Sequence, residues 1–159
     1  MGAESQWWEV IARKREAADA LLLDEAGRPL IVQNSWDDAW NIPGGCLNPG
    51  EPPRLGAERE VKEELGLRIT VGKLLVADWE PPSETLPIDG LMTMFDGGVL
   101  TAAQVAAIRL QESEIQAYRF VAPDEFPATL PDNLARRLRA ALSARESGIP
   151  VYLEDGYPV

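Results

Sequence analysis

Apolar positions recur along this chain in short runs with the length and the β-branched content of strands. These runs cover residues 18–23, 30–33, 69–79, 91–95 and 118–121. The charged, glycine-containing stretch 24–28 predicts a tight turn, so the first two runs are expected to form a hairpin. Asp96, Gly97 and Gly98 predict another turn after the fourth run. The pattern predicts a strand-rich domain with helices between its strands.

Two longer segments have the apolar spacing of amphipathic helices. Residues 53–65 begin after paired prolines, place apolar side chains at positions 57, 61 and 65, and are followed by the helix-ending Gly66. Residues 134–144 carry leucines at the same i, i+4, i+8 spacing, with Asp132 or Asn133 as the expected helix cap. Residues 102–110 are also helix-prone, with Thr101 as a cap. One long helix is therefore expected in each half of the chain.

The first long helix carries three acids on one face. Glu63 and Glu64 fall in its last turn, where the helix dipole disfavours a negative charge by roughly 0.3–1 kcal/mol. Glu60 and Glu64 also repel one another at the i, i+4 spacing. Such a face predicts a bound cation. Because the ligands are oxygen atoms only, a hard divalent ion such as Mg²⁺ or Mn²⁺ is favoured.

The chain contains no histidine and a single cysteine, Cys46. A zinc site built on this one cysteine is excluded, as are nucleophile schemes that need a histidine base. A single cysteine also excludes an internal disulfide. Any catalysis must therefore rely on carboxylates and a metal ion.

Residues 45–67 resemble the Nudix box of the MutT-like Nudix hydrolases, whose pattern is G-x5-E-x7-R-E-U-x-E-E-x-G-U, where U is a bulky aliphatic residue. A chance match of its seven fixed identities at one starting point has a probability on the order of 10⁻⁹. Residues 40–45 are similar to the aromatic-x-x-Pro-Gly-Gly segment that precedes the box in this family. Every specified position matches: Gly45, Glu51, Arg59, Glu60, Val61, Glu63, Glu64, Gly66 and Leu67.

The resemblance implies the Nudix fold, an α/β/α sandwich with a mixed β-sheet, over nearly the whole chain. A single domain is expected for residues 1–159, with its core at about 17–145. The tail, residues 146–159, is too apolar for a free linker. It is expected to pack on the domain or on a partner subunit, which leaves a homodimer open.

The resemblance also implies catalytic roles for the box residues. Arg59 is expected to orient a neighbouring carboxylate, Glu51 or Glu60, through a charge-assisted hydrogen bond. Glu51 also fits a structural role that closes the loop onto the helix. The implied ligands of Mg²⁺ or Mn²⁺ are the Gly45 carbonyl and the carboxylates of Glu60, Glu63 and Glu64.

Candidate site residues also lie outside the box. Glu114, just before the last core strand, is expected to be an extra ligand or general base, or else an ordinary exposed acid. Trp36 either stacks on a nucleobase or packs the box helix against the sheet, and Trp40 is a weaker candidate for stacking. Asp132 and Asn133 either read the edge of a base or only cap their helix.

These expectations together imply a metal-dependent pyrophosphohydrolase. Water would attack phosphorus in a nucleoside diphosphate linked to another moiety, with ADP-ribose, a nucleotide sugar and a (d)NTP all open as substrates. The alternative is a catalytically silent Nudix domain that binds or senses a nucleotide. Since such a domain is expected to have lost box acids, the complete box favours the enzyme.

Charge and hydropathy limit the partners and the location. A net charge of −11 disfavours a nucleic acid polymer and favours a small nucleotide-type substrate that binds through a metal ion. No run of 18 apolar residues predicts a transmembrane helix, so no membrane partner is expected. The first ten residues lack the charged and apolar regions of a leader, which favours a cytoplasmic location.

Overall fold

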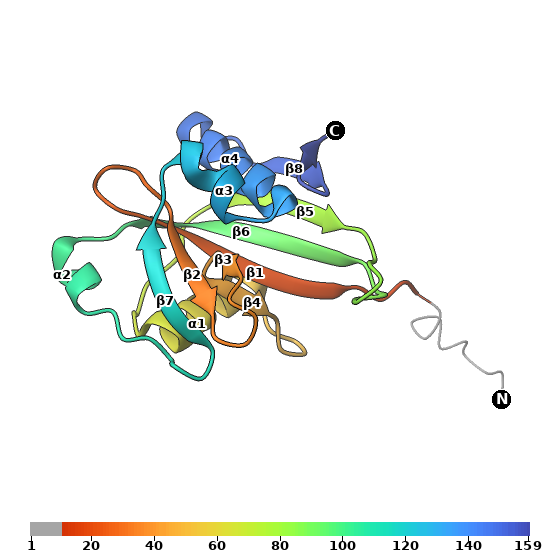
Figure 1. The fold of residues 1–159 in the computed structure, drawn as a ribbon. Coiled ribbons are helices and arrows are strands. Elements are labelled where there is room, and N and C mark those ends of the chain that lie inside the picture. Colours follow the sequence, from red (N-terminus) through yellow and green to blue (C-terminus); the bar gives the residue numbers. More distant parts are fainter. Residues whose placement is uncertain (1–10) are drawn as a thin grey trace.

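The computed structural model describes residues 11–159 (Figure 1). Residues 1–10, on which the cytoplasmic expectation rests, lie outside this range. None of the helices within residues 11–159 has both the length and the apolar character needed to span a bilayer. The elements in chain order are β1 (Arg15–Leu23), β2 (Leu30–Asn34), β3 (Trp40–Asn41), β4 (Gly44–Cys46), α1 (Pro53–Leu65), β5 (Leu74–Glu80), β6 (Gly90–Val99), α2 (Ala102–Ala106), β7 (Ile115–Phe120), the 3-10 helix η2 (Pro123–Glu125), α3 (Phe126–Thr129), α4 (Asp132–Ser147), β8 (Val151–Glu154) and β9 (Tyr157–Pro158).

A six-stranded sheet crosses the domain in the strand order β4-β1-β6-β5-β8-β9. Strand β1 runs parallel to β6 and antiparallel to β4, whereas β5 runs antiparallel to β6 and parallel to β8. A second sheet of three strands has the order β3-β2-β7. The expected α/β fold with a mixed sheet is confirmed.

Helices α1 and α4 lie on opposite sides of the six-stranded sheet (Figure 1). Side chains of β1 alternate between the two faces, as the geometry of a strand requires. Ala20 and Leu22 pack into the buried cluster that contains the apolar side chains of α1. Leu21 and Leu23 pack into the other cluster, which contains those of α4. Strand β1 therefore belongs to both halves of the core.

Helix α1 has the bounds that the sequence predicts. Pro52 is its N-cap and Pro53 its first residue, and Gly66 ends it in the left-handed conformation with φ 70°. The Gly66 N–H donates to the carbonyl of Lys62. All of these signals are local, so the sequence alone suffices to place this helix.

Strands β1 and β2 do not form the expected hairpin. They share only an isolated bridge between Leu23 and Pro29, beside the turn in which Asp24 N–H donates to the Arg28 carbonyl. Both edges of β1 are already paired, with β4 and β6, so β2 pairs instead with β3 and β7 in the second sheet. The turn was predicted correctly, but the pairing was wrong.

Two further boundaries differ from the sequence-based expectation. Residues 69–73 form a loop rather than the start of β5, because the Val71 N–H donates to the Glu58 side chain (3.0 Å) instead of to a neighbouring strand. Residues 96–98 continue β6 rather than turning. Their glycines accommodate a bulge opposite Leu21 and Leu22, where Gly98 has φ 81°.

The ends of the later helices also differ. Helix α2 is shorter than expected, although the Thr101 cap is present. Helix α4 begins at Asp132 and its N-cap is Pro131, so neither Asp132 nor Asn133 holds the expected cap position. The Asn133 side chain nevertheless accepts from the Leu134 N–H in the first turn, at 2.9 Å. The tail that follows pairs through β8 with β5, and it therefore extends the six-stranded sheet.

Candidate active site

The loop before α1 is held against β1 by two glycines that leave no room for side chains. Gly44 and Gly45 pair with Asp19 and Ala18, respectively. A Cβ atom on Gly44, which has φ 153°, would lie 2.3 Å from Asp19 Oδ1. A Cβ on Gly45 would lie 2.7 Å from the carboxylate carbon of Glu60. Glycine is therefore required at Gly44, where the loop meets the backbone of β1, whereas a side chain at Gly45 would displace the Glu60 carboxylate.

Arg59 connects the loop to three box carboxylates. Its Nε and Nη2 atoms donate to the two oxygens of Glu51 at 2.7 and 2.9 Å. Its Nη1 atom donates to Glu60 Oε1 at 2.7 Å and to Glu63 Oε2 at 2.9 Å, and Nη2 also reaches the Cys46 carbonyl at 3.0 Å. The paired Arg59–Glu51 contact is the strong two-pronged type. The expectation that Arg59 orients Glu51 or Glu60 agrees with this geometry for both residues.

Glu51 closes the loop as well as binding Arg59. Its Oε2 atom accepts a hydrogen bond from the Asn48 N–H at 2.9 Å. The Arg59 side chain, followed by the Asn48 N–H, lowers the pKa of Glu51 to about 2. Glu51 is therefore ionised and fully engaged by protein groups, which agrees with the structural role considered for it.

Glu64 is the most buried of the box acids, with 6 % of its surface exposed. Burial raises the pKa of Glu64 to about 9, the Gly44 N–H opposes this shift, and the negative charges of Glu60, Asp19 and Glu114 add to it. Burial also raises the pKa of Glu60, against the effect of Arg59. This part of the molecule gathers more negative charge than its own cations neutralise, as in a site that takes a cation.

The donor atoms fit a hard divalent ion, but the structure does not assemble them into a cluster. Glu60 and Glu63 accept hydrogen bonds from Arg59, while Glu64 accepts one from the Gly44 N–H at 3.0 Å. Accordingly, within residues 11–159 no three acidic or cysteine side chains are grouped closely enough to hold a metal ion. Glu60 and Glu63 each give one oxygen to Arg59 and keep the other for an ion. The available ligands are all oxygen atoms, the type that Mg²⁺ and Mn²⁺ prefer.

Glu114 lies where the sequence predicted, in the turn before β7. Its backbone is fixed by hydrogen bonds with Gln111 and Ser35. Its negative charge adds to the raised pKa of both Glu60 and Glu64, so this charge lies near the box acids. It is exposed and free to approach a ligand there.

A cavity of about 360 Å³ opens between the box loop and the start of α4. Asn133 and Trp40 line this cavity, whereas Asp132 and Trp36 do not. Trp36 is 67 % exposed at the tip of a turn that a hydrogen bond between Asn34 and Asp37 closes. The preference for Trp36 over Trp40 as a substrate contact is therefore not supported by the geometry, and Asp132 is likewise placed outside the cavity.

Five charged residues that line this cavity were not identified from the sequence: Arg15, Asp19, Asp37, Glu80 and Arg137. Glu80 accepts hydrogen bonds from Arg15 and Arg137, and Arg137 also donates to the fully buried Asp78 at 2.7 Å. These residues come from β1, β5 and α4, so no local spacing connects them. Asp19 alone had a signal in the sequence, since it is a charged residue inside the apolar run 18–23.

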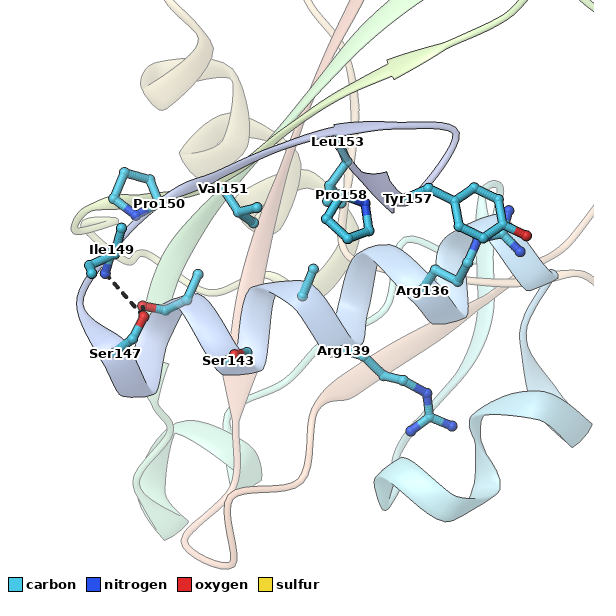
Figure 2. A pocket seen from close by; sticks show the side chains of 13 residues that line it. Arg136, Arg139, Ser143, Ser147, Ile149, Pro150, Val151, Leu153, Tyr157 and Pro158 are labelled. Carbon is cyan, nitrogen blue, oxygen red and sulfur yellow. Dashed lines mark hydrogen bonds between the residues drawn. The ribbon is translucent and has the colours of Figure 1, made fainter.

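A larger cavity of about 640 Å³ lies between α4 and the β8–β9 hairpin (Figure 2). Ile149, Val151 and Pro158 face α4 there, and the Arg136 guanidinium stacks 4.0 Å from the centre of the Tyr157 ring. None of the box residues lines this cavity. It is therefore separate from the candidate active site.

Comparisons with known proteins agree with this arrangement. The model of the NUDIX domain matches residues 13–142. A MutT-like protein of Streptomyces ambofaciens is 28 % identical over 136 residues, which cover 86 % of this chain and 80 % of that protein. The crystal structure of a MutT protein from Methanosarcina mazei Go1 superimposes with a TM-score of 0.71 at 25 % identity, covering 87 % of this chain and 98 % of the other.

A shorter match is to human diphosphoinositol polyphosphate phosphohydrolase 2, at 38 % identity over 64 residues. These residues cover 40 % of this chain and 36 % of the human protein, so the match spans about a third of that relative. The family model, in contrast, covers most of the chain. The chain therefore belongs to the Nudix family of hydrolases, which act on phosphoanhydride bonds.

Proposed function

We propose that this protein is a metal-dependent pyrophosphohydrolase that cleaves a nucleoside diphosphate linked to another moiety. Water attacks phosphorus in this reaction, and ADP-ribose, nucleotide sugars and (d)NTPs are the candidate substrates. The observation that carries the proposal is the position of Glu64, whose buried carboxylate is held by the Gly44 N–H beside Glu60. A buried group of acids binds a cation, and the cation in turn binds an anionic substrate in the neighbouring cavity.

The residues that would hold Mg²⁺ or Mn²⁺ are Glu60, Glu63 and Glu64, together with the Gly45 carbonyl. When bound, the ion neutralises charge on the diphosphate and lowers the pKa of the attacking water. The close approach of Gly45 to the Glu60 carboxylate supports the inclusion of its backbone in this set.

The remaining groups position these acids and the substrate. Arg59 holds Glu60 and Glu63 from one side and the Cys46 carbonyl from the other, so it keeps the loop and α1 in register. Glu114 is the candidate general base, because it is exposed and its charge lies near the box acids. Asn133 is the candidate contact to the distal part of the substrate, since it lines the cavity from α4.

The size and charge of the site favour a small molecule. The cavity of about 360 Å³ has the volume of a nucleotide-binding pocket rather than of a polymer groove. A net charge of −11 opposes binding of a phosphate backbone. A nucleotide-type substrate in the cytoplasm is therefore the proposed partner.

The direct test is phosphate release, after coupling with a phosphatase, from ADP-ribose, nucleotide sugars, dinucleoside polyphosphates and ordinary and oxidised dNTPs. Each reaction is run with Mg²⁺, with Mn²⁺ and with chelator. We expect turnover of one substrate class that disappears with chelator. Turnover that survives the chelator would contradict the metal site. Absence of turnover, combined with ligand-induced thermal stabilisation, would favour a nucleotide-sensing domain instead.

A further inference from the structure

Asp19 is a buried acid in the cavity that has no hydrogen-bond partner within residues 11–159. It projects from β1 on the side of the sheet that faces α4, and 9 % of its surface is exposed. Burial, with the negative charges of Glu80 and Glu60, raises the pKa of Asp19 to about 7, although the charge of Arg137 opposes the shift. A buried carboxyl group without a partner destabilises the folded protein. The Asp19 carboxyl group at the cavity wall is therefore available to a ligand.

The other charged groups around the cavity each have at least one partner, although the buried Nε of Arg15 has none among the described residues. Glu80 Oε2 accepts a hydrogen bond from Arg15, and Glu80 Oε1 accepts one from Arg137. The Nε atom of Arg137 donates to Asp78. Asp37 accepts from Asn34 and from the Ala39 N–H. Asp37 is exposed and keeps one free oxygen, so Asp19 is the buried acid in this wall with both oxygens left for a bound molecule.

We propose that Asp19 is a specificity-determining residue that accepts a hydrogen bond from an uncharged hydroxyl or amino group on the moiety attached to the diphosphate. This inference rests on the proposed function and names what the far end of the same site recognises. Asp19 pairs in the sheet with Gly44, so it lies at the junction between the diphosphate end of the site and the cavity. It is positioned to contact the first group beyond the phosphates.

The charges of the wall also limit the chemical class of that moiety. Three acids, Asp19, Asp37 and Glu80, line the cavity with two arginines, and both arginines are bound by Glu80. A phosphorylated moiety would add negative charge beside these three acids, which is unfavourable. The cavity therefore suits a neutral sugar or base that donates hydrogen bonds.

Three substrates built on one scaffold separate the possible sources of the hydrogen bond. ADP-ribose carries both sugar hydroxyls and an amino group, IDP-ribose lacks the amino group, and the ethyl ester of ADP lacks the second sugar. The kcat and KM of each are measured for the wild type, for Asp19→Ala and for the isosteric Asp19→Asn. Glu25→Gln, an exposed loop acid with the same charge change, is the control, and thermal melts verify that each variant is folded.

We expect Asp19→Ala to lower kcat/KM by roughly 10- to 150-fold, mainly through KM, for substrates that carry the recognised group. A loss on ADP-ribose and IDP-ribose that is much smaller on ethyl-ADP would identify a sugar hydroxyl. A loss on ADP-ribose and ethyl-ADP that is much smaller on IDP-ribose would identify the amino group. An equal loss on all three substrates, or on none, would overturn the proposal, since the recognised group would then belong neither to the second sugar nor to the amino group of the base.

A binding measurement keeps this test separate from the proposed function. Calorimetric titration of ADP-ribose without divalent ions is carried out on the wild type and on both variants. Weaker binding by Asp19→Ala would support the proposal even if the wild type hydrolyses nothing, and unchanged affinity would overturn it. In addition, Asp19→Asn should bind ADP-ribose 5″-phosphate better than the wild type does, because the repelling carboxylate is gone.

Discussion

The Gly44 N–H donates a hydrogen bond of 3.0 Å to Glu64 Oε2 across 20 positions of the chain. This contact joins the end of the loop before α1 to the last turn of that helix. It fixes one carboxylate oxygen of Glu64 and leaves the other available. The loop and the helix therefore set the position of this acid together.

Glu64→Gln is expected to lower turnover by several orders of magnitude while the fold is retained. The amide oxygen of glutamine can still accept from the Gly44 N–H, but a neutral amide is a poor ligand for a divalent ion. Turnover of the preferred substrate and the melting temperature are the two measurements. Glu146→Gln, an exposed acid near the end of α4, should behave as the wild type does. Full activity of Glu64→Gln would remove Glu64 from the metal site.

Gly44→Ala is expected to destabilise the protein by about 1–3 kcal/mol and to reduce activity. Its Cβ would lie 2.3 Å from Asp19 Oδ1 and 2.5 Å from the Ala18 carbonyl, so β4 would have to move away from β1. Urea unfolding and turnover measure both effects. The control is Gly27→Ala, which also has positive φ but has open space around it and lies far from the box. Equal activity of the two variants would show that the close approach at Gly44 is not needed.

Arg137→Met is expected to cost about 3–5 kcal/mol of unfolding free energy. The substitution leaves Asp78, which is fully buried, without its charged partner at 2.7 Å. The matched control is Arg145→Met, which breaks a half-exposed pair with Asp96 and should cost about 0–1 kcal/mol. Denaturant unfolding of both variants gives the comparison. Similar costs would mean that Asp78 finds another partner.

Glu51→Gln is expected to lower the melting temperature at neutral pH, and the difference from the wild type should narrow as the pH falls. The pKa of Glu51 is lowered to about 2 by Arg59 and the Asn48 N–H. An acid with a lowered pKa in the folded state stabilises the protein above its unfolded pKa of 4.5, and this contribution is lost as the pH falls towards 2. Melting curves between pH 7 and about pH 3 test this sign. A difference that grows in acid would contradict it.

Several features follow from local sequence and were predicted correctly. The bounds of α1 follow from its prolines and Gly66, and the box spacing places the acids of α1 on the helix face that meets the loop. The cap at Thr101 is equally local. Where a turn or a strand was predicted wrongly, the residues behind the prediction form a different local structure. The glycines at 97 and 98 form a bulge within β6, and the Val71 N–H donates to the Glu58 side chain rather than to a strand.

The sequence by itself determined the family resemblance, the main helix and the acids of the box, because each depends on residues within a few turns of one another. Only the tertiary structure decided which strands pair and which side chains line the cavity. Asp19 and Arg137 come from distant segments and meet because α4 packs over the six-stranded sheet. Trp36 points to solvent and Trp40 lines the cavity because one turn closes between them. Such contacts arise from packing between elements, which periodicity along the chain does not encode.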